Sequence, residues 1–520
     1  MLLRANSFSH LPRELLLRLS IQHSHPSARW LSTSQARRNV IDELEQRGMV
    51  ADLTRSALPS TSAPVTLMQG PQYCSRAVRK HVDQPTTVYL GVDPSARSLH
   101  VGNLLALIGL LHFRLEGHTS IALIGGATGS VGDPSGRSTE RNALSADILE
   151  ANSKAITKQV TGFLERGVPF ALSRTSKRHV EEMEDQKTFG CVKVTNNLEW
   201  LGGMSLLDFL STVGKTARIS TMLSRESVKS RLDSSSGLSF TEFSYQLLQA
   251  FDFLTLHQRH ACTIQLGGSD QLGNIMSGVE MIRKSKLALG EEGKEKALGG
   301  EQEDPAYGVT MPLLTTAAGD KFGKSAGNAV WLDADMTSPF DFYQFFLRTT
   351  DDDVLKYLKI FSFIRVIELH GIIADHTSQP AHRVAQKILA AEATELVHGP
   401  EGLRQALAAT EVYYGSDLSK LDLASTITSL DAGAFIPSAL VRLSKADFIN
   451  DPIDKLLTSS GLFASKTQAR KAIEQGTIQI NGVRLAARSF QRALAEEDVL
   501  QGGLVVLRSG KSTHKAVLLQ

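Results

Sequence analysis

Two short basic segments carry residue types suited to nucleotide chemistry. The first is His100-Val101-Gly102-Asn103, which follows the apolar run Thr87–Val92, and the second is Lys321-Phe322-Gly323-Lys324-Ser325. The first is expected where a strand leads into a helix, and the free N–H groups at a helix N-terminus bind phosphate. The second is a glycine-containing loop whose lysines can stabilise charge that develops on phosphorus. Together the two segments predict an enzyme that activates its substrate with ATP.

A glycine-rich run follows the predicted strand Ser120–Ile124. It spans Gly125–Gly136, contains Asp133, and is followed closely by Arg137 and Arg141. It lacks the Gly-Lys-Ser/Thr ending of a Walker loop, so it is not a P-loop. Glycine lets the backbone approach a ligand closely, the carboxylate suits a substrate ammonium group, and the arginines suit phosphate. Taken alone, such a run also fits an ordinary tight strand-to-helix connection.

A polar stripe lies on a predicted helix farther along the chain. Tyr245, Gln249 and Asp252 recur at positions i, i+4 and i+7, so they share one helix face. That face is either solvated or the wall of a half-buried pocket, and the flanking Phe and Leu residues favour the pocket. A second glycine-rich segment, Gln265–Asn274, then places Asp270 where a carboxylate can bind a ribose diol.

These groups need a scaffold to bring them together. From residue 87 to about 345, short apolar strands alternate with amphipathic helices, which predicts a parallel sheet wound by helices. Ligands of such sheets bind at the carboxyl ends of the strands. Because the motifs follow strands, we expect them to converge there. The predicted strands are Thr87–Val92, Ser120–Ile124, Val168–Leu172, Thr263–Leu266 and Val309–Leu314.

Length and composition limit the remaining possibilities. A chain of 520 residues is too long for one ordinary core and predicts about two to four domains. The net charge of +2 points to no polyanionic partner, and the three scattered cysteines form neither a zinc motif nor a disulfide framework. No apolar run is long enough to cross a bilayer. We expect a helix over 39–50, a Ser/Pro-rich loop over 55–72, a polar surface insertion over 287–306 and helices over 346–445.

The first 38 residues have the composition of a targeting segment. Residues 1–38 hold six arginines, no lysine and a single acid, Glu14. Leucines around Arg13 and Arg18 give a basic amphipathic patch, which is typical of a mitochondrial transit peptide. A secretory signal is excluded because Arg18 interrupts the apolar run. Cleavage is expected near Ser34–Asn39, and the alternative interpretation is a disordered basic tail.

With these motifs in hand, the chain from about Val40 onward resembles the class I aminoacyl-tRNA synthetases. Within that class it is similar to tyrosyl-tRNA synthetases of the bacterial and mitochondrial type, and the resemblance points to a fungal member. The His100 segment stands for the family's HIGH motif and the Lys321 segment for its KMSKS motif. Three further runs match nearly residue for residue: Gly125–Gly136, Ser239–Phe253 and Gln265–Asn274.

The resemblance implies a domain organisation and a place in the cell. The fold would be α/β, and the protein would be a homodimer in the mitochondrial matrix, with no membrane partner. The implied parts are a transit peptide (1–38), a Rossmann-like parallel-sheet catalytic domain (39–345) with a helical dimerisation insertion (about 200–260), an α-helical anticodon-binding domain (346–445) and a small α+β S4-like RNA-binding domain (451–520).

The resemblance also implies roles for individual residues. Tyr89 and Asp252 would bind the phenol hydroxyl of L-tyrosine, while Gln271 would bind its carboxylate region. Its α-ammonium group would be held by Asp133, Tyr245 and Gln249. The ATP site would comprise Gly91, Asp93, Ser95, His100, Gly102, Asn103, Gly268, Asp270, Lys321 and Lys324. Arg137 and Arg141 would bind pyrophosphate, and the catalytic set would be His100, Asn103, Lys321, Lys324 and Ser325.

The C-terminal segment supports an RNA partner. Asp451–Gln520 carries ten Lys and Arg against six Asp and Glu, a net charge of +4. Lys466, Arg470 and Lys471 surround the start of a predicted helix, followed by a strand and turn over 476–482. This pattern resembles the S4 domain, which places cations on RNA phosphates. A solvated basic helix is the alternative, and tryptophanyl-tRNA synthetases lack such a domain.

These observations predict a tyrosine–tRNA ligase. It would use ATP, accompanied by Mg²⁺, to form tyrosyl-adenylate and would then transfer tyrosine to the 3′ end of mitochondrial tRNA(Tyr). The resemblance implies no protein-bound metal or prosthetic group. The alternative function is an RNA-binding protein that assists splicing of group I intron RNA, as filamentous-fungal relatives do, as a second or sole activity.

Overall fold

The computed structural model describes most of the chain in two compact units. Of the described residues, the larger unit holds those of His25–Leu332 and Thr349–Leu389, and the smaller holds those of Asp333–Arg348 and Ala390–Gln520. The predicted transit peptide, Lys321, Arg137 and Arg141 lie outside the described residues. The described residues are 39–55, 71–135, 144–174, 189–232, 237–288, 304–317, 319, 324–325, 328–414, 440–486, 489, 492–510 and 513–520.

A six-stranded sheet in the order β1-β6-β5-β2-β3-β4 forms the centre of the larger unit. All neighbours pair in parallel except β1, which is antiparallel to β6. The chain runs outward from β2 through β3 to β4 and returns on the other side of β2 as β5. Ligands bind at such a reversal point. The strands are β1 (Asp52–Arg55), β2 (Thr87–Val92), β3 (Thr119–Ile124), β4 (Val192–Asn196), β5 (Cys262–Gly268) and β6 (Tyr307–Met311).

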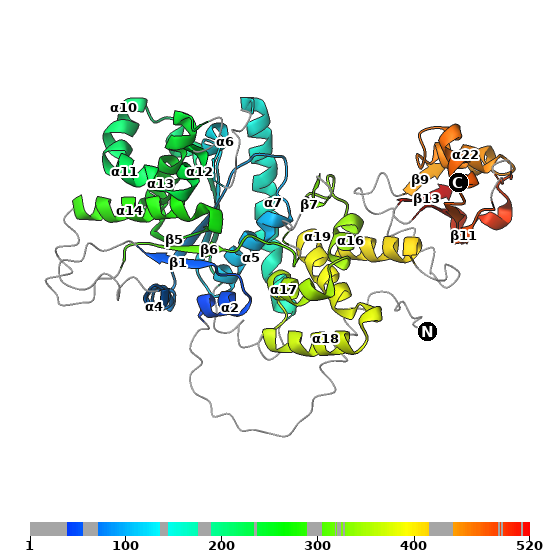
Figure 1. The fold of residues 1–520 in the computed structure, drawn as a ribbon, viewed down its shortest axis with the longest axis horizontal. Helices are drawn as coiled ribbons and strands as arrows, with labels where there is room; N and C mark the ends of the chain where they lie inside the picture. Colours follow the sequence, from blue (N-terminus) through cyan, green and yellow to red (C-terminus); the bar gives the residue numbers. More distant parts are fainter. Residues whose placement is uncertain are drawn as a thin grey trace, which may run out of the picture. The chain divides into compact units, whose positions relative to one another are not determined.

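Helices cover both faces of this sheet. Tyr89 of β2 packs on Phe253 of α13 (Phe240–His260), with ring centroids 5.2 Å apart. On the other face, Gly109 lies so close to Met311 that a Cβ would fall 1.9 Å from its Cε. Coverage of both faces explains why the central strands are apolar runs. Figure 1 shows α13 (Phe240–His260) and α14 (Leu272–Ala288) on one side, and α2 (Val40–Gln46), α4 (Pro71–Val82) and α5 (Val101–Leu115) on the other.

The helix predicted over 39–50 is confirmed as α2 and belongs to the core. The Asn39 side chain caps its N-terminus by accepting the N–H of Ile41. Val40, Ile41 and Leu44 are fully buried. The buried Arg47, at the other end of α2, donates to the carbonyl oxygens of residues 359, 362 and 364. Any leader must therefore end before this helix if the unit is to keep its core.

One predicted strand is wrong. Val168–Leu172 is the end of α7 (Ala146–Ser173), whose buried face also includes Phe163 and Leu164 one turn earlier. A five-residue apolar run fits either a helix or a strand. The edge strand of the sheet is β4 instead, and its half-buried polar residues gave no apolar run to detect. The prediction also missed β1 and extended β6 too far, because Pro312 has no N–H to pair.

The helical prediction for 346–445 is confirmed for most of its described residues. The exception is β9 (Leu440–Leu443), a strand that pairs with the last strand of the chain. Within α19 the backbone breaks at Gly399, whose φ of 74° is left-handed, and Pro400 begins the next segment. The helices after the sheet are α16 (Pro339–Leu347), α17 (Asp351–Phe361), α18 (Val366–Ser378) and α19 (Val384–Tyr414).

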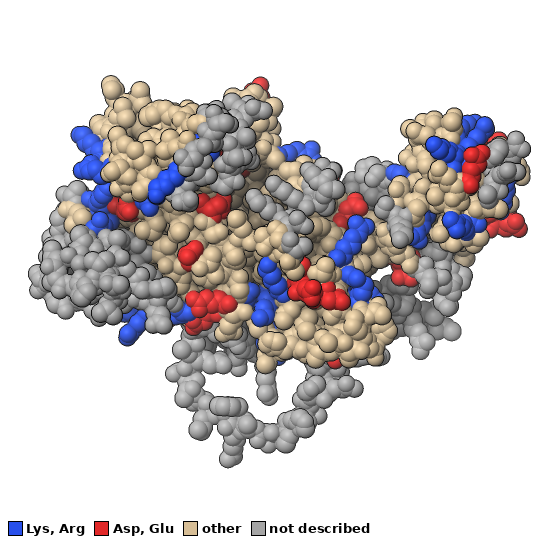
Figure 2. Space-filling view, viewed as in Figure 1, with Lys and Arg blue, Asp and Glu red and all other residues tan. Residues whose placement is uncertain are grey.

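The surface carries charges of both signs. Figure 2 shows separate groups of Lys and Arg and of Asp and Glu on this face. Within the described ranges, no helix combines the length and apolar character needed to span a membrane.

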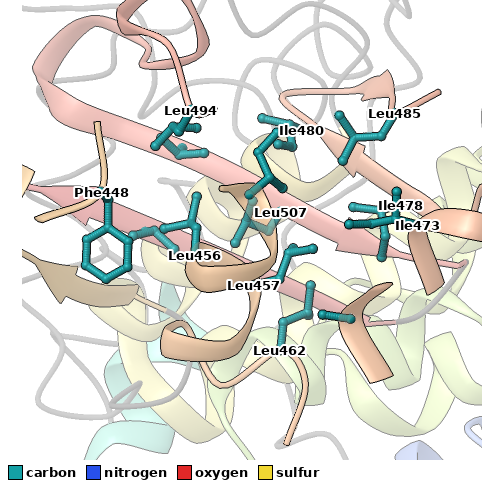
Figure 3. Close-up of a cluster of buried hydrophobic side chains, with 14 of the residues drawn as sticks. Phe448, Leu456, Leu457, Leu462, Ile473, Ile478, Ile480, Leu485, Leu494 and Leu507 are labelled. Carbon is teal, nitrogen blue, oxygen red and sulfur yellow. The ribbon is translucent and has the colours of Figure 1, made fainter. Parts of the chain in front are cut away.

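The C-terminal domain is a five-stranded sheet covered on both faces. Val505 and Leu507 of β12 (Leu504–Ser509) pack with the helices α21 (Ile453–Ser459) and α22 (Lys466–Glu474) in the cluster of Figure 3. The alternate residues Leu504 and Val506 pack instead on the end of α19. The expected helix at Lys466, followed by a strand and turn over 476–482, is confirmed. The remaining strands are β10 (Ile478–Ile480), β11 (Val483–Arg484) and β13 (Thr513–Leu519), in the order β11-β10-β12-β13-β9.

Candidate active site

The ends of β2 and β5 bring two predicted motifs to the reversal point of the sheet. The first strand leads through the exposed Gly91 to Asp93, and the second leads through Gly268 to Asp270 and Gln271. A Cβ at Gly268 would lie 2.4 Å from Oδ1 of Asp270, so a side chain there would displace this carboxylate. The two segments expected to frame a nucleotide therefore lie next to each other at the carboxyl ends of the central strands β2 and β5.

Two buried polar side chains, Tyr89 and Gln265, lie within β2 and β5, before these strand ends. Tyr89 has no exposed surface, and its hydroxyl has no hydrogen-bond partner among the described residues. Gln265 is its neighbour in the β2–β5 register, so both side chains point to the same face. Its buried Oε1 likewise lacks a partner within the described part of the chain. Leaving a buried polar atom unpaired costs about 1–3 kcal/mol, so the pair indicates a polar group of a ligand.

A buried carboxylate lies near the Tyr89 phenol. Asp252 is 3% exposed and accepts hydrogen bonds from Nε1 of Trp200 at 2.7 Å and Nδ2 of Asn197 at 2.9 Å. Burial raises the pKa of Asp252 to about 7, although both donors oppose the shift. Burial, and then the charge of Asp252, raises the pKa of the Tyr89 phenol well above its usual value. The two groups can together bind one further hydroxyl.

The polar stripe of α13 is buried to half-buried and is not a solvated face. Tyr245 and Asp252 are buried and Gln249 is half-buried. The Tyr245 hydroxyl donates to Oδ2 of Asp93 at 2.8 Å, which ties the helix to the end of β2. Burial, and then the charge of Asp93, raises the pKa of Tyr245 well above its usual value. Its hydroxyl is therefore a neutral hydrogen-bonding group.

A second hydrogen-bond network joins α13 to the glycine-rich run and to the segment after β5. Asp133 accepts the backbone N–H of Ser135 at 2.9 Å and Nε2 of Gln271 at 2.7 Å. Asn274 donates to Oε1 of Gln249 at 3.0 Å and to Oε1 of Gln271 at 3.3 Å. The glycine-rich run, α13 and the segment after β5 are thus joined by side-chain hydrogen bonds.

The His100 segment caps its own helix. Nδ1 of His100 accepts the N–H of Gly102 at 3.0 Å, and Oδ1 of Asn103 accepts the N–H of His100 at 3.1 Å. A neutral ring in this arrangement carries its proton on Nε2. A Cβ at Gly102 would lie 2.7 Å from Cε1 of His100, so a side chain at 102 would displace this ring. The donors of the segment are the ring Nε2 and the Asn103 amide nitrogen.

The backbone ties the lysine loop to the His100 segment. The strands β7 (Lys324–Ser325) and β8 (Asn328–Ala329) pair as a hairpin. Directly after it, the carbonyl of Val330 accepts the N–H of Val101 at 2.9 Å, and His100 pairs with Trp331. The chain that follows the described end of the lysine segment, Lys324–Ser325, therefore pairs with the His100 segment.

The remaining predicted positions that the structure describes include four exposed residues. Ser95 is exposed after β2, and Lys466, Arg470 and Lys471 are exposed on α22. Nε of Arg470 donates to the buried Asp454 at 2.6 Å, which fixes that guanidinium. Within the described ranges, no group of three or more His, Cys, Asp and Glu is arranged to hold a metal ion.

Sequence analysis missed several residues of the site. Asn197 and Trp200 follow β4, the strand that had no apolar signal, so nothing marked them. Thr128 and Asn274 stand inside two quoted runs, where a neighbouring glycine, Gly129 or Gly273, was the available signal. Gln265 begins a run in which only the later residues were assigned roles.

Comparisons with known proteins identify the family. Residues 80–415 match the family described as tRNA synthetases class I (W and Y), and residues 440–517 match the tyrosine–tRNA ligase SYY-like C-terminal domain. The mitochondrial tyrosine–tRNA ligase of Rattus norvegicus is 41% identical over 436 residues, covering 83% of this chain and 85% of the relative. The chain belongs to the class I tyrosyl-tRNA synthetases. As a member of this family it is a tyrosine–tRNA ligase, and ATP is a substrate of the family.

Other tyrosyl-tRNA synthetases are similarly close. The mitochondrial enzyme of Drosophila melanogaster is 39% identical over 508 residues, covering 96% of this chain and 97% of the relative. The C-terminally truncated mitochondrial tyrosyl-tRNA synthetase structure of Aspergillus nidulans is 34% identical with a TM-score of 0.55, covering 71% of this chain and 92% of that one. The names of these relatives give no support to the splicing alternative.

Proposed function

We propose that this tyrosyl-tRNA synthetase activates L-tyrosine with Mg²⁺-ATP at the β2–β5 reversal point and serves mitochondrial tRNA(Tyr). A carboxylate oxygen of tyrosine attacks the α-phosphorus, and the bond from that phosphorus to pyrophosphate breaks. Transfer to the 3′ end of the tRNA follows. The step needs no enzyme nucleophile, only positioning and stabilisation of charge.

The unpartnered hydroxyl of Tyr89 near the Asp252 carboxylate carries this proposal. A substrate phenol placed there donates to Asp252 and accepts from Tyr89, which satisfies the buried atoms. The direct test is pyrophosphate exchange with each of the twenty amino acids in turn. We expect exchange with tyrosine alone, and strong exchange with another amino acid or none with tyrosine would overturn the proposal.

The opposite end of the pocket suits the α-ammonium group. Tyr245 gives its hydrogen to Asp93, so its oxygen is available to accept an N–H. We assign the ammonium group to Tyr245, Gln249 and Asp133, and the carboxylate region to Gln271. The half-buried position of Gln249 supports this assignment.

The nucleotide is assigned to the two basic segments and the strand ends. Helix N-termini and reversal points of parallel sheets favour phosphate binding. His100 and Asn103 would donate to phosphate, and Lys321, Lys324 and Ser325 would act on the departing pyrophosphate with Arg137 and Arg141. The remaining contacts to ATP are assigned to Gly91, Asp93, Ser95, Gly102, Gly268 and Asp270.

Tyrosine binding should weaken below neutral pH. Burial raises the pKa of Asp252 from 3.8 to about 7, and a protonated carboxyl cannot accept the phenol hydrogen at the protonated oxygen. We expect the KM for tyrosine in pyrophosphate exchange to rise about tenfold between pH 8 and pH 6. The Asp252→Asn variant, which has no proton to gain, should show a high KM that changes little over this range. An equally steep rise in both proteins would contradict the assignment.

The same shift gives Asp252 a pH-dependent effect on stability. Its folded pKa lies above the unfolded value, so the folded state holds a proton that the unfolded state releases. The contribution of Asp252 to the free energy of unfolding therefore falls as pH rises through the window from 3.8 to about 7.

We assign tRNA binding to the C-terminal domain as an S4-like module. The exposed cations Lys466 and Lys471 on α22 support this assignment. Replacing both by alanine should weaken tRNA binding and reduce the slope of log affinity against log salt by about 1.5. Arg470 is left in place, because its loss would strand the buried Asp454. Pyrophosphate exchange, which needs no tRNA, is the internal control, and unchanged tRNA affinity would contradict the assignment.

A homodimer is supported by exposed apolar side chains of the insertion at about 200–260. Large exposed apolar patches mark interaction sites. The short helices α10 (Leu206–Phe209), α11 (Ile219–Leu223) and α12 (Glu226–Leu232) carry most of them. The exposed residues are Leu206, Leu207, Leu210, Ile219, Leu223, Leu232 and Phe240.

Introducing charge into this surface should dissociate the dimer. Leu207 is 77% exposed, and the Leu207→Asp variant should sediment as a monomer at concentrations where the unaltered protein is dimeric. Ile367 on α18 is 72% exposed and gives the matched control, since Ile367→Asp should stay dimeric. A dimeric Leu207→Asp protein would place the interface elsewhere.

The mitochondrial matrix is the proposed location. The arginine-rich, acid-poor residues 1–38 and the mitochondrial names of the rat and Drosophila relatives support it. We retain the proposed division into a transit peptide (1–38), a catalytic domain (39–345), an anticodon-binding domain (346–445) and an RNA-binding domain (451–520).

A further inference from the structure

Five polar side chains form a continuous hydrogen-bonded chain through the candidate active site. Asn197 donates from Nδ2 to Oδ2 of Asp252 at 2.9 Å and to Oγ1 of Thr128 at 3.1 Å. Thr128 donates to Oδ1 of Asp93 at 2.7 Å, and Tyr245 donates to Oδ2 of the same carboxylate at 2.8 Å. The chain joins the group proposed to recognise the phenol to a group proposed to bind the ammonium.

Thr128 stands at the middle of this chain and is held tightly. Thr128, Asn197 and Asp252 are all buried. The backbone N–H of Ala127 donates to Oδ1 of Asn197 at 2.8 Å, so the short helix that carries Thr128 is fixed to the same amide. The Thr128 hydroxyl donates one hydrogen bond and accepts another. Water could therefore not replace either partner unless the surrounding residues moved.

Gly125 shows how little room surrounds the hydrogen bond between Thr128 and Asp93. A Cβ at Gly125 would lie 2.0 Å from Oδ1 of Asp93 and 2.4 Å from Oγ1 of Thr128. Any side chain at 125 would thus enter the hydrogen bond between them. Part of the glycine-rich run is explained by this bond and not by approach to a ligand.

The number of hydrogens that each side chain can donate fixes the direction of every hydrogen bond in this series of five side chains. Nδ2 of Asn197 uses both of its hydrogens, and the single hydrogens of Thr128 and Tyr245 both go to Asp93. The Tyr245 oxygen is then left as an acceptor. That is the role required of a group that binds an ammonium ion.

We propose that Thr128 is a positioning residue that links the two ends of the tyrosine site. It orients Asp93, which directs the Tyr245 oxygen toward the ammonium group, and it holds Asn197 against the Asp252 carboxylate. The inference rests on the proposed function of this pocket. Thr128 is not itself among the residues assigned to contact tyrosine.

Removing the hydroxyl while keeping the shape tests the proposal. Thr128→Val should raise the KM for tyrosine in pyrophosphate exchange by about tenfold or more, since it removes an acceptor from the buried Asn197 amide and a donor from the half-buried Asp93 carboxylate. Thr128→Ser keeps the hydroxyl and should restore most of the affinity. Thr394 gives the matched control, because it is fully buried and its Oγ1 has no partner within the described ranges, so Thr394→Val should leave exchange unchanged.

A double-mutant cycle separates positioning from simple loss of stability. If Thr128 acts through Tyr245, the effects of Thr128→Val and Tyr245→Phe on the tyrosine KM should be strongly non-additive. If the change in tyrosine KM of the double variant equalled the product of the changes in the two single variants, the inference would be overturned. No tyrosine-dependent exchange in the unaltered enzyme would instead overturn the proposed function, whereas an active enzyme unaffected by Thr128→Val overturns only the role of Thr128.

Should Thr128→Val not fold, Gly125→Ala tests the same bond from the backbone. Its added methyl enters the Thr128–Asp93 contact, so the tyrosine KM should rise. Gly203 is the matched control, because a Cβ there meets no atom within 4 Å. Equal exchange kinetics for Gly125→Ala and Gly203→Ala would contradict the inference.

Discussion

Replacing Lys324 by alanine should slow tyrosine-dependent pyrophosphate exchange by about 100- to 1,000-fold while leaving tyrosine binding nearly intact. Negative charge develops on the departing pyrophosphate in the transition state and not on bound tyrosine, so the lysine acts on the rate. The hairpin that begins at Lys324 is followed directly by the backbone contacts to Val101 and His100. Exchange kinetics and an equilibrium titration with tyrosine measure the two quantities separately.

Lys387 provides the control for this experiment. It is an exposed lysine on α19, and Lys387→Ala should exchange at the unaltered rate. If Lys324→Ala lost tyrosine affinity and rate to the same extent, the lysine would be part of the amino-acid site instead of the phosphate site.

The Asp252→Ala variant should lose most of its preference for tyrosine over phenylalanine. A pocket built to hydrogen-bond a hydroxyl rejects the analogue that lacks it, because buried polar groups are then left unpaired, and this enzyme family is the usual example. Without the carboxylate, the substrate hydroxyl loses its acceptor. We expect the ratio of kcat/KM for tyrosine to kcat/KM for phenylalanine to fall by about 100-fold. Most of this change should come from a lower kcat/KM for tyrosine.

A companion variant shows whether the effect is specific. Tyr89→Phe removes a hydroxyl that has no partner among the described residues, so the protein should remain as stable as before while the same ratio falls to a smaller extent. Thermal unfolding of both variants records the structural cost, which should be larger for Asp252→Ala because the N–H donors of Trp200 and Asn197 lose their acceptor. Unchanged selectivity in Asp252→Ala would remove this residue from substrate recognition.

Local patterns carried much of the prediction. The spacing of Tyr245, Gln249 and Asp252 alone indicated a shared helix face, because helical periodicity depends on residues only a few positions apart. The apolar runs of β2, β3 and β5 were found for the same reason. The run Val168–Leu172 was misassigned because five apolar residues satisfy both helical and extended periodicity.

The sequence by itself determined the family, the order of the motifs and the residue types available for chemistry. Only the tertiary structure decided which of them touch. Asp93 and Tyr245 are 152 positions apart, and no spacing rule predicts their hydrogen bond. The fold likewise decided that His100 caps its own helix and that Thr128 lies between Asn197 and Asp93, since a buried polar group takes its partner from whatever the packing brings within reach.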